Sequence, residues 1–255
     1  MRCSSLLATC LLPLAMTAIG TASAADLAVL SAGAIEPGLK AAAGAFEKQT
    51  GHTVKITFNT APELKKRMDG NEAFDVVIAP RAAIGEFAAG NKLAETRAIV
   101  GRVGMGVAVR EGAPVPDISS AEALKQSVLA ADSLVFNRAS TGLYLEGLLK
   151  KMEVYPQVEA RTTRYPDGAA VMEHVIKGQG NEIGFGAITE ILLYEGKGLK
   201  FVGPVPAAVQ NYTTYAAAPL VVGQKQEVAQ EFVSFLAGAV GKPLFVAAGI
   251  TEDAQ

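Results

Sequence analysis

Small and hydroxyl-bearing residues recur at four points where a predicted strand passes into a predicted helix. These points are residues 31–34, 59–61, 137–142 and 166–168. At the N-terminus of a helix the first backbone N–H groups lack partners within the helix, and the helix dipole adds a partial positive charge. Anions bind at such places. Together the four turns predict an anion site, whereas each turn alone is also what an ordinary helix cap requires.

These turns supply the first candidate ligand-binding residues. Their side chains offer hydroxyl, amide and carboxylate groups, and their smallest residues leave the backbone N–H groups accessible. The set comprises Ser31, Gly33, Ala34, Asn59, Thr60, Ala61, Ser140, Thr141 and Asp167. Asp167 is also the expected N-cap of the helix that follows it, because an aspartate oxygen accepts well from first-turn N–H groups.

Strands and helices alternate along the chain around these turns. We expect strands at residues 27–30, 53–58, 74–79, 104–109, 133–136, 158–163 and 182–185. We expect helices at residues 36–50, 119–130, 143–152, 168–177, 189–195 and 227–239, with a further helix opened by a capping box at Thr60 and Glu63. Repeated strand–helix units predict an α/β fold with a mostly parallel sheet. Ligands of such sheets bind at the carboxyl ends of the strands, where the four turns lie.

The composition is that of a folded protein and excludes two classes. Of the 255 residues, 50% are hydrophobic and 19% are charged, which excludes a mainly disordered chain. The 23 basic and 25 acidic side chains give a net charge of −2. Nucleic-acid-binding domains usually carry a basic excess, so we expect no nucleic-acid partner.

The first 24 residues have the features of a cleavable export signal. Arg2 supplies a positive charge, residues 6–19 form an apolar stretch, and residues 22–24 (Ala-Ser-Ala) form a small-residue cleavage site. The apolar stretch is shorter than the roughly 20 residues that a membrane-spanning helix needs. We therefore expect a signal peptide over residues 1–24 and a periplasmic mature protein without a membrane anchor.

Several chemistries are not supported by the residue types or their spacing. Cys3 and Cys10 both precede the expected cleavage site, so the mature chain has no thiol. His52 and His174 are far apart, and no group of His, Asp and Glu has the spacing of metal ligands. The chain also has no phosphate-binding loop and no dinucleotide fingerprint. The sequence therefore predicts a site with neither a metal nor a cofactor.

The order of several motifs resembles that of the periplasmic molybdate-binding proteins of ABC transporters. The motifs are Ser-Ala-Gly-Ala at 31–34, Phe-Asn-Thr-Ala-Pro-Glu-Leu at 58–64, Phe-Asp-Val-Val-Ile-Ala at 74–79, Gly-Leu-Tyr at 142–144 and Ile-Gly-Phe-Gly at 183–186. The resemblance covers essentially the whole chain after the signal peptide.

This resemblance implies a type II periplasmic-binding-protein fold, in which two α/β lobes joined by two crossover strands enclose a ligand cleft. It implies crossovers near residues 107–110 and 215–220. Lobe one then comprises residues 25–108 and 216–255, and lobe two comprises residues 109–215. The implied partners are a small anionic ligand and, in transport, an inner-membrane ABC permease, and we expect a monomer.

The ligand-binding pattern departs from that of the molybdate-binding members. Those proteins hold their oxyanion with two serines and a tyrosine, and these places are taken here by Ala34, Ala61 and Ala187. The chain instead has Arg138 in its third turn and Arg81 after the strand at 74–79. Arginine pairs bidentately with carboxylates, so an organic polycarboxylate fits this replacement better than a compact tetrahedral oxyanion. The alternative role of each arginine is that of an ordinary surface charge.

Aconitate isomerase is a second branch of the same resemblance. It implies a reaction without metal or redox cofactor, in which a proton leaves one carbon of an allylic system and returns to another. Such a site needs groups that hold carboxylates and a group that moves the proton. The candidates are Tyr144, Tyr212 and Tyr215, with core packing as the alternative role of each. Glu36, Glu63 and His174 follow in rank.

Two functions of different classes therefore stay open. The first is a periplasmic solute-binding protein of an ABC-type transporter, with an organic carboxylate such as a tricarboxylate as ligand. The second is aconitate isomerase activity on the same fold, and molybdate or tungstate binding is the third. A binding cleft and a cofactor-free isomerase site use the same parts, so the sequence alone does not separate the first two.

Overall fold

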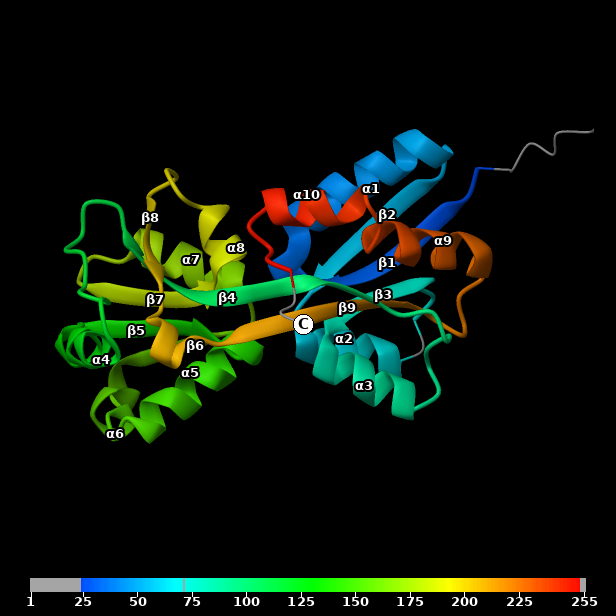
Figure 1. The fold of residues 1–255 in the computed structure, drawn as a ribbon. Coiled ribbons are helices and arrows are strands. Elements are labelled where there is room, and N and C mark those ends of the chain that lie inside the picture. Colours follow the sequence, from blue (N-terminus) through cyan, green and yellow to red (C-terminus); the bar gives the residue numbers. More distant parts are fainter. Residues whose placement is uncertain (1–23, 71, 253–255) are drawn as a thin grey trace, which may run out of the picture.

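The structure is a computed structural model that describes residues 24–70 and 72–252. Apart from Ala24, the expected signal peptide lies outside the described residues. None of the described helices has both the length and the apolar character needed to cross a membrane. The described chain forms two α/β lobes that lie side by side (Figure 1).

Lobe one is a sheet with helices on both faces. Its strands stand in the order β2-β1-β3-β9-β4, with bounds β1 (Asp26–Ala32), β2 (Thr53–Asn59), β3 (Val76–Pro80), β4 (Ala98–Arg110) and β9 (Tyr212–Pro219). One face is covered by α1 (Glu36–Thr50), α9 (Gln226–Leu236) and α10 (Gly241–Ala247), and the other by α2 (Ala61–Asp69) and α3 (Arg81–Ala89). A short 3-10 turn, η1 (Gly33–Ile35), joins β1 to α1.

Lobe two continues the sheet in the order β4-β7-β5-β6, and β8 pairs with β4. The strand bounds are β5 (Ser133–Asn137), β6 (Thr162–Tyr165), β7 (Glu182–Ala187) and β8 (Leu199–Pro204). The helices are α4 (Ala121–Ala130), α5 (Ser140–Lys151), α6 (Tyr155–Val158), α7 (Gly168–Lys177) and α8 (Ile188–Leu192), with 3-10 turns η2 (Glu159–Arg161) and η3 (Ala207–Val209). In both lobes the strands that feed the pocket-facing turns run parallel to one another.

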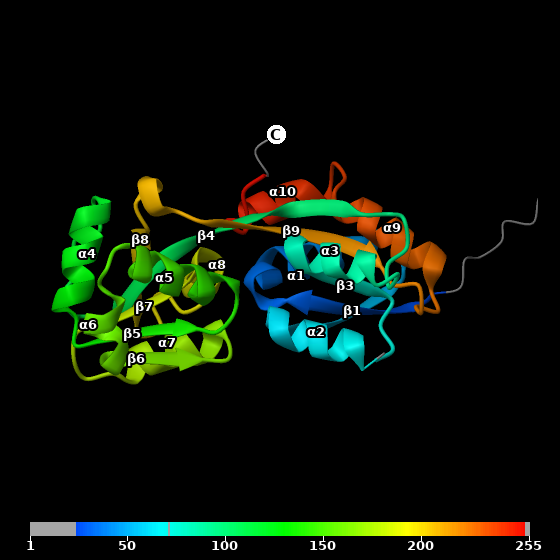
Figure 2. The same cartoon turned by 90° about the horizontal axis from the view of Figure 1, so that it is seen from below.

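Strands β4 and β9 connect the lobes (Figure 2). Strand β4 pairs with β9 as far as Gly104 and with β7 from Met105 onward. This change of partner in β4 comes earlier than the predicted crossover at residues 107–110. The second crossover, from lobe two back to lobe one, precedes the predicted residues 215–220, because β9 already pairs within lobe one from Tyr212. The lobe limits at residues 108 and 216 stay a prediction.

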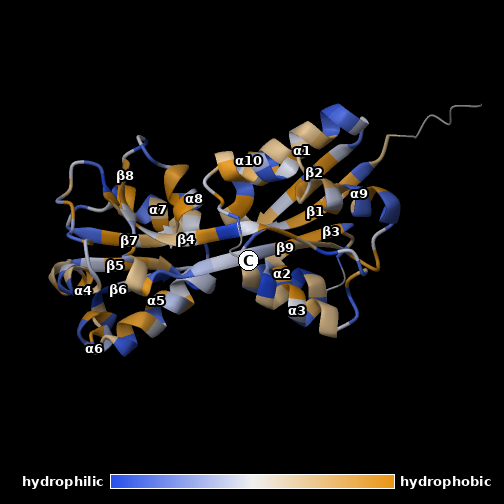
Figure 3. Cartoon of the chain, in the orientation of Figure 1, coloured by the Kyte–Doolittle hydropathy of each residue, from blue (hydrophilic) through white to orange (hydrophobic). Residues whose placement is uncertain are grey.

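Side chains alternate in direction along each strand, and this alternation divides the core of lobe two into two layers. Val107 and Phe136 pack toward α4 and α5, whereas Ala108 and Val135 pack toward α7 and α8. Successive side chains of a strand point to opposite faces, which explains why neighbouring residues join different layers. Strands β1 and β3 carry mainly hydrophobic colours in Figure 3, whereas β9, rich in Thr, Tyr and Ala, is close to white.

Local signals explain some of the described helix starts but not others. The Asp167 side chain accepts from the Ala170 N–H at 2.8 Å, as predicted. Thr60 is the N-cap of α2, but its side chain makes no capping hydrogen bond, so the predicted capping box is wrong there. The Thr60 side chain lies instead at a cavity between the lobes.

The predicted strand over residues 158–163 is largely wrong. Residues up to Arg161 form α6 and η2, and β6 begins only at Thr162. Pro156 in the first turn of α6 has the backbone angle of a helix start, which favours a helical turn here.

Candidate functional site

A cavity of about 330 Å³ lies between the two lobes. All four strand-to-helix turns contribute to its wall, through Gly33, Ala34, Asn59, Thr60, Ala61, Ser140, Thr141, Asp167 and Gly168. The turns meet because the parallel strands of both lobes direct their carboxyl ends toward the cleft. Four segments that are distant in the sequence therefore form one site.

The two arginines and one serine of the candidate set do not line this cavity. Arg81 is the first residue of α3, Arg138 lies in the turn between β5 and α5, and both side chains are exposed. Ser31 is fully buried within β1, and its hydroxyl donates to the carbonyl of Ala32 at 3.2 Å. The residues on either side of Arg138, however, do face the cavity.

The three candidate tyrosines lie in different surroundings. The Tyr144 hydroxyl donates to the carbonyl of Val209 at 3.0 Å and lies outside the cavity. Tyr212 is 46% exposed, and the Arg102 guanidinium lies 4.4 Å from the centre of its ring. Tyr215 is buried and lines the cavity. Of the three, Tyr215 is therefore the one that the structure brings to the site.

Burial strongly raises the pKa of the Tyr215 hydroxyl, and the charge of Glu190 raises it further. Hydrogen bonding with Ser140 and Thr213 opposes these effects. The Tyr215 hydroxyl is therefore protonated at neutral pH and can donate a hydrogen bond.

Glu190, a residue outside the sequence-based candidate set, also lines the cavity. It is the third residue of α8, and its carboxylate accepts a hydrogen bond from the backbone N–H of Ala187, the N-cap of that helix. This contact is one half of a capping box. A β-carbon placed on Gly168 would lie 2.3 Å from Oε2 of Glu190, so the carboxylate packs against the first turn of α7.

The surroundings of Glu190 change its proton affinity. Burial raises the pKa of Glu190 to about 7, and the charges of Asp167 and Glu36 contribute in the same direction. The Ala187 N–H opposes them. A carboxyl group that titrates near neutral pH inside a cavity is a candidate for proton transfer.

A sequence signal for Glu190 does exist. A fifth strand-to-helix turn, Ala187 to Glu190, places an acidic residue at the third helical position after a buried strand. The same spacing separates Thr60 from Glu63, where it predicted a helix start. The strand over residues 182–185 and the helix over residues 189–195 were predicted, but Glu190 in the first turn of that helix was not weighed as a site residue.

One polar atom of the cavity wall lacks a partner. The Oδ1 atom of Asn59 is buried and has no hydrogen bond within the part of the chain that the structure describes. Buried polar atoms in folded proteins are nearly always satisfied. Since Asn59 lines the cavity and its Oδ1 is an acceptor, a donor group of a bound molecule is a natural partner for this atom.

The ionisable groups of the cavity wall other than tyrosine are all carboxylates. They are Glu36, Glu63, Asp167 and Glu190, and the described wall contains no Lys, Arg or His. Glu36 pairs with Lys40 at 2.5 Å, Glu63 pairs with Lys66 at 3.8 Å, and Asp167 caps α7. In the described structure Glu190 and Asp167 both lack a basic partner, and each accepts from one backbone N–H group; of the two, Glu190 is the one whose pKa burial raises.

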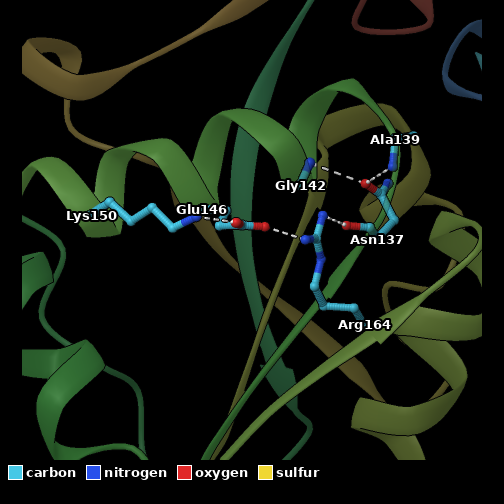
Figure 4. A network of polar contacts seen from close by, with 6 residues as sticks. All are labelled: Asn137, Ala139, Gly142, Glu146, Lys150 and Arg164. Carbon is cyan, nitrogen blue, oxygen red and sulfur yellow. Dashed lines mark hydrogen bonds and ion pairs between the residues drawn. The ribbon is translucent and has the colours of Figure 1, made fainter. Parts of the chain in front are cut away.

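A hydrogen-bond network holds the third turn in place (Figure 4). The Asn137 side-chain oxygen accepts from the N–H groups of Ala139 and Gly142, each at 3.1 Å. Arg164 donates to the Asn137 carbonyl at 3.3 Å and pairs with Glu146. A β-carbon on Gly142 would lie 1.8 Å from that carbonyl oxygen, so the turn also requires this glycine. The network positions Ser140 and Thr141, and two of its own members, Asn137 and Ala139, line the cavity.

Residues 24–70 and 72–252 contain no cluster of three or more His, Cys, Asp or Glu side chains arranged to hold a metal ion.

Known proteins with related sequences include a family of solute-binding proteins and a protein named as an isomerase. The family of bacterial extracellular solute-binding proteins matches residues 27–251. A curated relative, named aconitate isomerase, from a Pseudomonas species is 31% identical over 220 residues, which cover 83% of this chain and 82% of that protein.

Solved structures share the fold at low identity. The periplasmic molybdate-binding protein of Azotobacter vinelandii superposes with a TM-score of 0.73 at 17% identity, covering 89% of this chain and all of that one. PEB3 with bound L-phospholactate superposes with a TM-score of 0.70 at 14% identity, covering 89% of this chain and all of that one. These similarities show the type II periplasmic-binding-protein fold.

Proposed function

The chain belongs to the family of bacterial extracellular solute-binding proteins, and from that premise we propose that it is an isomerase of a small unsaturated polycarboxylate, with aconitate as the substrate. The observation that carries the proposal is Glu190, a carboxyl group with a pKa of about 7 in the wall of the cavity between the lobes. The relative named aconitate isomerase supports the choice of substrate.

The cavity has features suited to a polycarboxylate. The turns that open α1, α2, α5 and α7 all contribute to its wall, and a converging set of helix N-termini favours negative charge. A volume of about 330 Å³ is near the lower end of the range for small-molecule sites.

Three cations near the cavity are the proposed charge partners of the substrate. Lys40 pairs with the wall residue Glu36, Arg81 directly follows the wall residue Pro80, and Arg138 lies between two wall residues. Two lobes joined by two strands can close as hinged bodies around a ligand. We propose that closure brings these side chains to the outer carboxylates of the substrate.

Glu190 is the proposed proton-transfer residue. In its ionised form it removes a proton from the CH2 carbon of trans-aconitate, and the electron pair left behind spreads over the allylic system and its carboxylates. The same proton, or one exchanged with solvent, then returns to the former vinyl carbon, and the double bond moves. A group whose pKa lies near the working pH is effective in both directions.

Tyr215 is the proposed donor that steadies the anionic intermediate. Its raised pKa keeps the O–H group protonated at neutral pH, so it can donate to a substrate carboxylate as negative charge develops there. The same cavity wall holds Tyr215 and Glu190, and the charge of one acts on the other.

The test is an assay of the purified mature protein with trans-aconitate, without added metal or cofactor. Chromatography follows the cis isomer, and D2O reports exchange at the carbon atoms. We expect turnover by the unmodified protein and a loss of about 10²–10⁴-fold in kcat for Glu190→Gln, the usual contribution of a general acid–base group. Glu195→Gln, an exposed glutamate three residues beyond α8, is the matched control. Absence of turnover at high protein concentration, or full activity of Glu190→Gln, contradicts the proposal.

The second candidate is a solute-binding protein that delivers an organic carboxylate to an inner-membrane ABC permease. The family as a whole and the two-lobed fold favour it. A ligand that binds only the folded protein raises its melting temperature. Stoichiometric stabilisation by citrate or an aconitate isomer, without turnover, favours transport, and stabilisation by molybdate or tungstate alone points to the third candidate. Detection of the mature chain in a periplasmic extract tests the proposed location and the cleaved signal.

A further inference from the structure

The Glu190 carboxylate lies in a space that depends on two glycines. A β-carbon built on Gly168 would lie 2.3 Å from Oε2 and 2.6 Å from Cδ of Glu190. A β-carbon on Gly33 would lie 3.4 Å from Oε1, at the edge of ordinary contact. Gly168, in lobe two, is therefore the position where an added methyl group cannot coexist with the present place of the carboxylate.

The backbone itself does not require glycine at position 168. Gly168 is not among the glycines with positive φ, so alanine can adopt the same backbone conformation. The start of α7 is secured separately, because Asp167 accepts a hydrogen bond from the Ala170 N–H. The contact with Glu190 is therefore the main obstacle that an alanine would meet.

We propose that Gly168 is a positioning residue for Glu190: its missing side chain leaves the space in which the carboxylate lies against the first turn of α7, facing the cavity. This inference rests on the proposed function, in which Glu190 moves the proton. Alanine at position 168 has to displace the carboxylate by about 1 Å to restore ordinary contact, and a misplacement of about 1 Å can lower a rate about 100-fold.

The groups that face Glu190 indicate how its pKa should change when alanine replaces Gly168. They are Asp167 at the start of α7, Glu36 on α1, Tyr215 on β9 and Tyr194 two residues after α8. Burial is the main cause of the raised pKa of Glu190. A carboxylate pushed from α7 toward the cavity becomes better hydrated, so its pKa falls toward the ordinary value for glutamate.

The first experiment measures the contact without any activity. Gly168→Ala is made in three backgrounds, namely the unmodified protein, Glu190→Gln, which keeps the shape of the side chain, and Glu190→Ala, which removes it. We expect Gly168→Ala to lower the melting temperature in the first two backgrounds and to have little effect in the third. Gly147→Ala, in open space on α5, is the control and should show no coupling to Glu190. An equal loss in all three backgrounds overturns the proposal.

The second experiment measures the consequence for the site. A carbon-13 NMR titration of the Glu190 carboxyl group compares the unmodified protein with Gly168→Ala, and we expect a lower midpoint in the variant. In the isomerase assay we expect a kcat about 100-fold lower, a pH midpoint shifted in the same direction, and an unchanged KM. An unchanged NMR midpoint together with an unchanged kcat overturns the positioning role.

The two proposals fail separately. If the unmodified protein has no isomerase activity, the proposed function fails, while the melting-temperature coupling and the NMR midpoint still decide whether Gly168 positions Glu190. If activity is present but Gly168→Ala shows neither coupling nor a shifted midpoint, the proposed function stands and the role of Gly168 is refuted.

Discussion

Asp75 and Glu190 are both carboxylates held inside the molecule, at opposite ends of the parallel strands. Asp75 precedes β3 and is only 7% exposed. Its Oδ2 accepts from the Ala28 N–H at 3.0 Å, and its Oδ1 accepts from the N–H groups of Gln224 and Lys225 at 2.9 and 3.2 Å. Three backbone donors replace the water that a buried carboxylate loses, and they join β1, β3 and the segment before α9.

Glu190, in contrast to Asp75, has few hydrogen-bond donors around its carboxylate. One backbone N–H donates to it, and its other charged neighbours include two carboxylates, Asp167 and Glu36. The ionised form is therefore disfavoured, and the proton is held until about neutral pH. The comparison teaches that the number of donors, not burial alone, decides whether an inner carboxylate stabilises the fold or is kept available for proton transfer.

The largest effect should come from removing the structural carboxylate. Asp75→Ala leaves three backbone N–H groups without their acceptor, and each orphaned buried donor costs about 1–3 kcal/mol. Since these contacts are not additive, we expect a loss of about 3–5 kcal/mol in the free energy of unfolding, measured with urea. Ligand binding by the folded variant should not change, because Asp75 lies at the end of the sheet away from the cavity. A loss below about 1 kcal/mol would contradict this description of Asp75.

At Glu190 we expect the opposite effect, a gain in the free energy of unfolding when the carboxylate is replaced. Its pKa is about 7 in the folded protein against an ordinary value of 4.5, so the folded state binds the proton more tightly than the unfolded chain does. Glu190 therefore destabilises the folded state progressively as the pH rises from about 4.5 to 7, by at most about 3 kcal/mol. Glu190→Gln should be more stable than the unmodified protein near pH 8 and equally stable near pH 4, by urea unfolding. A stability difference that is independent of pH would refute this assignment.

An intermediate effect is expected at the third turn, where a charged side chain supplies donors to the backbone. Arg164→Met removes the hydrogen bond to the Asn137 carbonyl and leaves Glu146 with Lys150 alone. Hydrogen bonds to charged groups contribute about 1.5–3 kcal/mol, so we expect a loss of about 2 kcal/mol in the free energy of unfolding. The affinity for the ligand should also fall, because the turn carries Ser140 and Thr141. Unchanged ligand affinity, measured by calorimetry, would show that the network does not position the turn.

The smallest effect is expected at the exposed pair of Lys40 and Glu36. Both groups reach solvent, and such pairs contribute about 0–1 kcal/mol. Lys40→Ala should therefore change the free energy of unfolding by less than about 1 kcal/mol. It leaves the charge of Glu36 unbalanced, so the pKa of Glu190 should rise slightly, which an NMR titration would detect. A lower pKa would contradict the proposed influence of Glu36.

Much of the site could be predicted because it depends on short-range patterns. The four turns follow from strands that end in small or hydroxyl-bearing residues, and their meeting follows from the common direction of parallel strands. The direction of individual side chains could not be predicted from these patterns. Arg138 lies in the third turn and Arg81 begins α3 directly after β3, but both side chains are exposed, and the Tyr144 hydroxyl donates to the Val209 carbonyl. Sequence position places a residue at a turn, whereas packing decides where its side chain points.

The crossovers show the same distinction. The resemblance to periplasmic molybdate-binding proteins implied that two strands join the lobes, but the residue at which β4 exchanges β9 for β7 depends on pairing across the sheet. Gly104 and Met105 are adjacent in the chain and lie in the same strand, and what separates them is the strand with which each pairs.

The sequence by itself determined most of the strands and helices, their order, and the cap at Asp167, because these depend on residues within a few positions of one another. Only the tertiary structure decided the proton affinity of Glu190. Its environment is built by Gly33 and Glu36 from lobe one and by Asp167 and Gly168 from lobe two, and the lobe-one residues are more than 150 positions away in the chain. Burial and the charge of distant carboxylates set its proton affinity, and neither quantity exists before the two lobes come together.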